Sequence, residues 1–64
     1  MLTKAGTKVR HKKRGTIYEV LGGGVVQTEG PLKDEDRVVI YCGEDGTLWA
    51  RREEDFVDGR FELA

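Results

Sequence analysis

The chain is poor in the residues on which most enzyme and metal sites depend. Its 64 residues include one cysteine, one histidine and no serine. Zinc sites need several His or Cys ligands at workable spacing, and nucleophilic catalysis needs a nucleophile beside a base. We therefore expect no metal, no cofactor and no enzymatic activity. His11 is expected to be a strand histidine whose ring packs on Tyr18 or Trp49 and whose nitrogen bonds to the backbone or a carboxylate.

The single cysteine, Cys42, excludes an intrachain disulfide. It lies in an apolar run, where a free cysteine usually behaves as a small buried hydrophobe. Residues 1–6 lack the apolar segment of a signal peptide, and no apolar run approaches the roughly 20 residues of a membrane span. These absences predict a cytoplasmic protein that makes no membrane contact.

The length of the chain predicts one domain over residues 1–64, and we expect residues 1–6 to be frayed. A domain of about 60 residues buries only roughly 60% of the surface that its unfolded chain exposes. Such a domain has little material for a deep cleft. We expect its function to lie on a surface patch, in a shallow groove or at a flexible end.

The charge is unevenly distributed, although the net charge is only −1. Residues 1–14 contain six basic side chains and no acidic one, which gives +6. The other 50 residues contain five basic and twelve acidic side chains, which gives −7. Such asymmetry is typical of a nucleic-acid contact. The alternative is a basic strand that neutralises the acidic remainder.

The longest apolar run, residues 38–42, is rich in β-branched and aromatic side chains. Asp45-Gly46 follows it, a dipeptide that tolerates the backbone angles of a tight turn. Residues 47–50 then supply a return strand. This pattern predicts a β-hairpin over residues 37–52 that carries most of the apolar weight of the protein.

The length of the hairpin loop decides which face of the hairpin carries Trp49. A loop of two or four residues places Trp49 on the face of Ile40 and Cys42. A loop of odd length places it on the face of Val39 and Tyr41. The sequence leaves both arrangements open.

Further short strands flank the hairpin, because apolar residues alternate with polar ones and Gly or Pro separates the runs. We predict a bulge or bend at the three glycines 22–24, and a helical turn before the last strand. The predicted flanking strands are residues 7–13, 16–21, 25–29 and 60–63. The pattern predicts an all-β, SH3-like, strongly bent five-stranded antiparallel barrel. A meander sheet that does not close is the alternative.

Several short motifs follow one another in a suggestive order: Arg-His at 10–11, Arg-Gly at 14–15, Tyr-Glu-Val-Leu-Gly at 18–22, Leu-Trp-Ala-Arg at 48–51 and Arg-Phe-Glu at 60–62. This order resembles a family of small uncharacterised bacterial and phage proteins, whose pattern reads Tyr-Arg-His, Lys-Gly, Tyr-Glu-Val-Leu-Gly and Leu-Trp-x-Arg. Val9 stands where that pattern has an aromatic residue, Arg14 where it has Lys, and Arg52 where Pro is common. The resemblance covers most of the chain from Val9 onward. It implies an SH3-like fold and adds no active site.

Protein recognition is the function that the sequence favours first. SH3-like barrels can present aromatic grooves with acidic rims to extended peptide segments. The candidate contact residues are Tyr18, Tyr41, Asp45 and Trp49. The alternative for Tyr41 and Trp49 is that both rings belong to the core. An unknown protein partner is the first expectation, with the chain as a monomer or weak homodimer; a phage-encoded inhibitor of a host protein is a further alternative.

The basic first strand predicts a different site, for nucleic acid. Basic side chains there would contact phosphates, while exposed aromatic rings would stack on bases. The candidates are Lys8, Arg10, Lys12, Lys13 and Arg14. The acidic remainder of the chain opposes this alternative, unless the basic residues are well segregated from it.

Overall fold

A computed structural model of the chain describes residues 2–30 and 36–64, and most of the polar connection predicted before the hairpin lies outside this range. The elements are β1 (Lys8–His11), β2 (Ile17–Val25), β3 (Arg37–Gly43), β4 (Leu48–Arg52), α1 (Glu53–Phe56) and β5 (Phe61–Leu63). The short helix before the last strand was predicted from the sequence and is confirmed.

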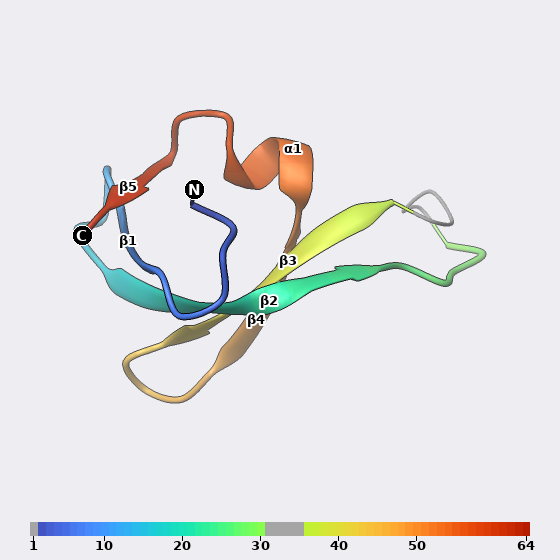
Figure 1. The fold of residues 1–64 in the computed structure, drawn as a ribbon, viewed down its shortest axis with the longest axis horizontal. Coiled ribbons are helices and arrows are strands. Elements are labelled where there is room, and N and C mark those ends of the chain that lie inside the picture. Colours follow the sequence, from blue (N-terminus) through green and yellow to red (C-terminus); the bar gives the residue numbers. More distant parts are fainter. Residues whose placement is uncertain (1, 31–35) are drawn as a thin grey trace.

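The strands form one antiparallel five-stranded sheet in the order β4-β3-β2-β1-β5 (Figure 1). The last strand therefore returns to pair with the first, as an SH3-like fold requires. The helix α1 makes the connection from β4 back across the sheet to β5. The all-β prediction is confirmed.

The sheet is bent, but its hydrogen-bonded ladder does not continue from β4 to β5 within the described residues. Side chains bridge the two strands instead. The guanidinium carbon of Arg51 on β4 lies 5.6 Å from the centroid of the Phe61 ring on β5. We call the side of the molecule between β4 and β5 the seam, and the functional surfaces described below border it.

The glycine segment bends β2 without ending it. The register with β3 shifts between Val20 and Gly22, so that Leu21 is the extra residue of a bulge. Gly22 has a φ of 154°, a backbone angle that residues other than glycine rarely adopt. The predicted bulge is thus confirmed. The separate strand predicted after it is wrong, because β2 continues pairing to Val25 and ends there.

The core lies on the inner face of the bend and is mainly aromatic and β-branched. Phe56 and Phe61 stack with ring centroids 4.4 Å apart, and Tyr41 contacts both rings. The helix α1 is too short to be stable alone, so its role is to place Phe56 in this core. The buried cluster consists of Val9, Val20, Val39, Tyr41, Phe56 and Phe61.

The hairpin loop has the odd length that places Trp49 on the face of Tyr41. Gly43 N–H donates to the Thr47 carbonyl at 3.0 Å, and Gly46 N–H donates to the Gly43 carbonyl at 3.0 Å. Gly46 has a φ of 84°, so the loop is a turn followed by a left-handed residue. Tyr41 and Trp49 are consequently direct cross-strand partners.

The described part of the predicted frayed terminus is attached to the sheet. Gly6 N–H donates to the Val20 carbonyl at 2.8 Å, and Val20 N–H donates to the Thr7 carbonyl at 2.8 Å. Leu2 packs against the core cluster. These contacts hold residues 2–7 against β2 and the core.

Candidate functional site

A shallow groove of about 820 Å³ lies beside the seam, and the charged side chains that line it are all basic. We call it the basic groove. Of its five basic residues, three come from the turn after β1, one from β4 and one from the segment before β5. The turn adjoins β5 because Lys12 N–H donates to the Arg60 carbonyl at 2.9 Å. The basic residues are Lys12, Lys13, Arg14, Arg51 and Arg60, with His11 beside them.

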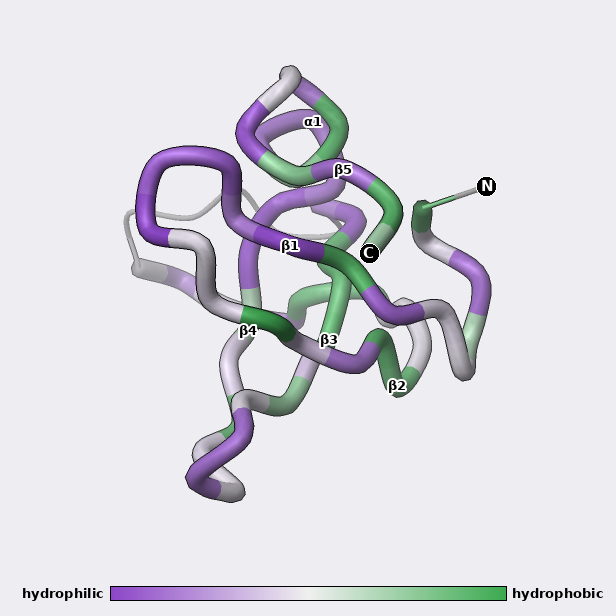
Figure 2. The backbone as a smooth tube through the Cα atoms, turned by 90° about the vertical axis from the view of Figure 1, so that its left-hand side faces the viewer, coloured by the Kyte–Doolittle hydropathy of each residue, from purple (hydrophilic) through white to green (hydrophobic). Residues whose placement is uncertain are grey.

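The basic turn is a short loop fixed by the chain itself. Gly15 N–H donates to the His11 carbonyl at 2.7 Å, and the φ of 74° at Gly15 lets the chain reverse there. Lys12, Lys13 and Arg14 are exposed on this turn. Figure 2 shows residues 10–14 as one continuous hydrophilic segment of the backbone.

Arg51 is held in the groove by aromatic side chains. Its Nε donates to the hydroxyl of Tyr41 at 3.4 Å, and its guanidinium lies over the ring of Phe61. A guanidinium on an aromatic face is attracted by the ring quadrupole. Arg51 therefore presents a positioned positive charge at the seam while its stem is partly buried.

Most of the groove cations have no carboxylate partner among residues 2–30 and 36–64. Arg60 is the exception, since its Nε lies 3.1 Å from Oδ2 of Asp58. Elsewhere in that part of the chain, Arg10, Arg37 and Arg52 pair with acidic side chains. The groove thus concentrates cations whose charge is not neutralised locally.

His11 lies under this group of cations. Its ring packs edge-on against Phe61, with centroids 5.2 Å apart, and not against Tyr18 or Trp49 as the sequence predicted, because β1 pairs with β5 and sets His11 directly across from Phe61. Partial burial, followed by the charges of Arg14, Arg51, Arg60 and Lys13, lowers the pKa of His11 below its ordinary value. The backbone N–H of Arg14 donates to Nδ1 at 3.2 Å, so Nδ1 acts as an acceptor in the neutral ring.

A second hollow, of about 390 Å³, adjoins the basic groove at Arg14, which lines both. We call it the aromatic hollow. It lies between the turn after β1 and the β3–β4 loop, with Tyr18 and Trp49 in its lining. Trp49 is 49% exposed and Tyr18 is half-buried. Glu44 and Asp45 border its loop side.

The predicted protein-contact residues divide between core and surface. Tyr41 is only 5% exposed, so it belongs to the core and cannot contact a partner directly. Tyr18, Trp49 and Asp45 meet in the aromatic hollow. Oδ1 of Asp45 accepts from Thr47 N–H at 3.0 Å, which lowers the pKa of Asp45. Its first structural role is therefore to fix the loop.

The predicted nucleic-acid residues also divide, because alternation along β1 sends them to different faces. Lys12, Lys13 and Arg14 lie in the basic groove. Lys8 and Arg10 lie on the outer face of the sheet, and Arg10 NH1 is 3.3 Å from Oε2 of Glu62. Lys8 and Arg10 therefore do not belong to the groove.

Sequence reasoning missed Arg51 and Arg60 as members of the basic site. Arg51 is the cross-strand partner of Val39, so an odd-length hairpin loop places it on the inner face with Trp49. Because the sequence left the loop length open, it did not show that Arg51 lies on the inner face. Arg60 precedes a three-residue strand, and only the pairing of β5 with β1 brings it to the basic turn.

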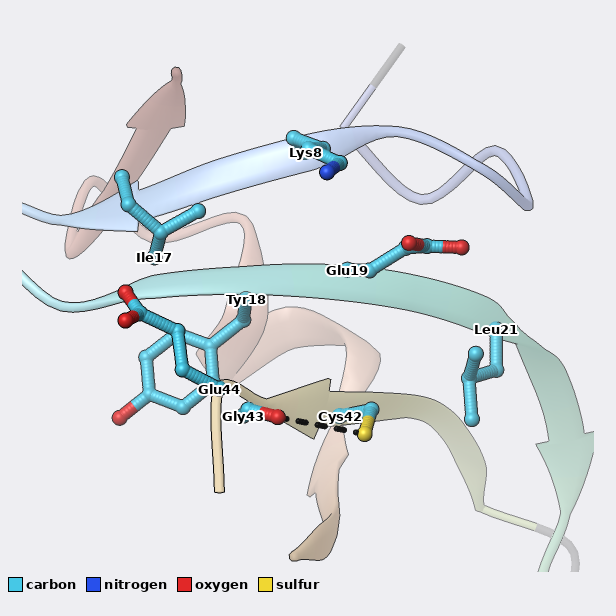
Figure 3. Close-up of a pocket in the computed structure, with 8 residues that line it drawn as sticks. All are labelled: Lys8, Ile17, Tyr18, Glu19, Leu21, Cys42, Gly43 and Glu44. Carbon is cyan, nitrogen blue, oxygen red and sulfur yellow. Dashed lines mark hydrogen bonds between the residues drawn. The ribbon is translucent and has the colours of Figure 1, made fainter. Parts of the chain in front are cut away.

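The outer face carries a different hollow, shown in Figure 3. Lys8 and Glu19 are cross-strand partners along its side, and Ile17 and Leu21 supply apolar surface. The Cys42 thiol donates to the Gly43 carbonyl at 3.4 Å. This hollow combines one cation with two carboxylates and lacks the single charge sign of the basic groove.

Two other observations concern the described residues as a whole. They contain no group of three or more His, Cys, Asp or Glu side chains placed to hold a metal ion. None of their helices has the length and apolar character needed to cross a membrane.

The comparisons with known proteins add no relative from which a function could be transferred. The chain matches no protein-family model, no curated protein and no solved structure.

Proposed function

We propose that the protein is a non-enzymatic nucleic-acid-binding module and that the basic groove contacts the phosphate backbone. The observation that carries this proposal is the groove itself, in which five basic side chains converge and no acidic side chain takes part in the lining. Phosphate contacts by Lys and Arg supply most of the affinity of sequence-independent nucleic-acid binding.

The charge asymmetry of the sequence supports the same proposal once the fold is known. The net charge of −1 opposes binding of a polyanion only if positive and negative charges are mixed over the surface. Around α1, Arg37 and Arg52 neutralise part of the acidic charge. Lys12, Lys13 and Arg14 lie on the turn between β1 and β2 and take part in none of these pairs.

Protein recognition, which the sequence favours first, remains a prediction. Its candidate contacts are Tyr18, Tyr41, Asp45 and Trp49, and the burial of Tyr41 leaves Trp49 as the main exposed aromatic residue among them. A peptide partner would need Trp49 but would not need the basic turn. The experiment below separates this function from nucleic-acid binding.

The test is fluorescence anisotropy of a labelled single-stranded DNA, titrated with the 64-residue protein at several salt concentrations. We expect log K to fall linearly with log salt, by about 0.7 for each phosphate contact. The triple variant Lys12→Ala, Lys13→Ala and Arg14→Ala should lose binding. Its matched control is Lys4→Ala, Lys8→Ala and Arg37→Ala, which also changes the net charge from −1 to −4.

The control triple should keep most of the affinity, because its three side chains lie outside the groove. Equal losses in the two triples would show that net charge alone governs binding and would contradict a groove site. Absence of any salt-dependent binding by the unmodified protein would contradict the proposed function as a whole.

A further inference from the structure

We propose that the aromatic hollow holds an unpaired base, so that the ligand of the basic groove is a single-stranded nucleic acid. This inference rests on the proposed function and specifies the class of ligand. The observation behind it is the continuity of the two surfaces, since Arg14 lines both the groove and the hollow. A chain that places phosphates in the groove can therefore place a neighbouring base in the hollow.

The Tyr18 ring of the hollow is held in position before any ligand arrives. It packs edge-on against Tyr41, with centroids 5.2 Å apart and planes at 87°. Gly43 lies beside this ring, since a Cβ at Gly43 would make an ordinary contact of 3.4 Å with Cε1 of Tyr18. Tyr18 is thus fixed by the core on one side and borders the hollow on the other.

Trp49 supplies the exposed aromatic surface. It stands directly across from Tyr41 in the hairpin, yet 49% of its surface is accessible. Every base has a π-face, so an exposed indole stacks on bases with little regard to sequence. On β4, Trp49 and Arg51 occupy alternate positions of the same face, about 7 Å apart. A base on Trp49 therefore has its own phosphate within reach of the groove cations.

The acidic border of the hollow determines on which side of it the nucleic-acid backbone passes. Glu44 and Asp45 lie on the loop side, opposite the basic turn. The carboxylate of Asp45, like that of any ordinary Asp, is charged at neutral pH, and Thr47 N–H donates to its Oδ1 at 3.0 Å. Phosphates are repelled from this side, and the backbone is directed past Arg14 while the base enters between the two loops.

This geometry distinguishes a single strand from other polyanions. In a duplex the bases are paired and stacked, and a base must be flipped out before it reaches such a hollow. Inorganic polyphosphate carries the charge but has no base. Both should interact with the basic groove alone.

The experiment uses Trp49 as its own reporter, because it is the only tryptophan of the chain. The protein is titrated with a short oligo(dT), with a duplex of the same length and with inorganic polyphosphate. We expect oligo(dT) to quench Trp49 emission and the other two to leave it nearly unchanged. Labelled-oligonucleotide anisotropy then compares Trp49→Ala, Trp49→Phe and Leu48→Ala.

Trp49→Ala should weaken oligo(dT) binding about tenfold and leave polyphosphate binding unchanged. Trp49→Phe should restore part of the loss, because it keeps an aromatic face. Leu48→Ala is the matched control: Leu48 is also exposed, but it precedes Trp49 and lies on the opposite face. Thermal unfolding of each variant shows whether the fold is retained.

The outcomes separate this inference from the proposed function. If oligo(dT) binds but Trp49→Ala leaves its affinity unchanged, the base site is overturned and the groove proposal stands. The same holds if the duplex binds as tightly and quenches Trp49 equally. If none of the three polyanions binds, both proposals are overturned.

Discussion

Arg51 and Phe61 are in contact across the seam, where the backbone ladder between β4 and β5 is missing. The guanidinium is positioned by an aromatic ring and by the hydroxyl of Tyr41. No carboxylate of residues 2–30 or 36–64 forms an ion pair with it. Its charge is thus both fixed in place and available to an anion.

Arg51→Gln should therefore weaken binding of single-stranded DNA several-fold and reduce the salt slope by about 0.7 to 1. The measurement is anisotropy over a salt series. Arg37→Gln is the control. It removes the same charge as Arg51→Gln, and Arg37 is exposed on β3, outside the groove. A salt slope that both variants lower equally would show that Arg51 makes no specific phosphate contact.

Binding should also depend on pH through His11. The folded protein lowers the pKa of His11 through partial burial and through Arg14, Arg51, Arg60 and Lys13. A bound phosphate offsets these cations and favours the charged ring, so binding takes up a proton. Affinity should rise as pH falls from about 7.5 to about 5.5. His11→Gln should flatten this rise; an unchanged pH profile in the variant would contradict the role of His11.

The same pKa shift has the opposite effect on the free protein. Because the pKa of His11 is lowered on folding, the unfolded chain binds more protons just below the ordinary pKa of about 6.5. The free energy of unfolding should therefore fall as pH drops through this window. Urea unfolding at several pH values measures it, with His11→Gln as the comparison; an equal pH dependence in that variant would assign the effect to other groups.

Val39→Ala should lower the free energy of unfolding by about 2 kcal/mol, because it leaves a cavity in the core. Val39 is 1% exposed and lies on β3, which pairs with β2 on one side and β4 on the other. Val25→Ala is the matched control, since Val25 is 61% exposed and should change stability by less than about 0.5 kcal/mol. Urea denaturation measures both. A loss below about 0.5 kcal/mol for Val39→Ala would show that the hairpin is not the core.

Gly46→Ala should cost about 1 kcal/mol of stability through backbone strain alone. Its φ is 84°, and an added Cβ would have no atom within 4 Å, so no clash contributes. Gly24→Ala is the control: its Cβ would make an ordinary contact of 3.9 Å with Val38, and stability should stay level or rise by up to about 1 kcal/mol. Thermal unfolding compares the two variants, and equal changes would contradict the strained-turn account.

Much of the fold could be predicted from local patterns. The apolar run of β3, the turn chemistry of Asp45-Gly46 and the bulge at the glycines are each encoded within a few neighbouring residues. The extent of β2 could not be predicted in this way. Pairing with β3 keeps the glycines extended, and the sequence of β2 alone does not reveal that pairing.

The candidate site was less predictable, since it depends on contacts between distant segments. Lys12, Lys13 and Arg14 are adjacent in sequence and were identified together. Arg51 and Arg60 reach them only through hairpin register and the pairing of β5 with β1. The first strand was predicted to run to residue 13, with Lys12 on the face of Lys8 and Arg10. That end is wrong, because β1 ends at His11 and Lys12 lies in the groove without them.

The length of the β3–β4 loop also constrains how this protein can change. If the loop kept its three-residue form, loss or gain of one residue between Gly43 and Thr47 would shift the pairing of β4 by one position. Trp49 and Arg51 would then turn together to the outer face, while Leu48 and Ala50 would turn inward. A deletion that the loop absorbed by shortening to two residues would instead leave Trp49 opposite Tyr41 and both side chains at the seam. The length and form of the loop together therefore fix the β3–β4 register, and with it the placement of Trp49 in the aromatic hollow and of Arg51 in the basic groove.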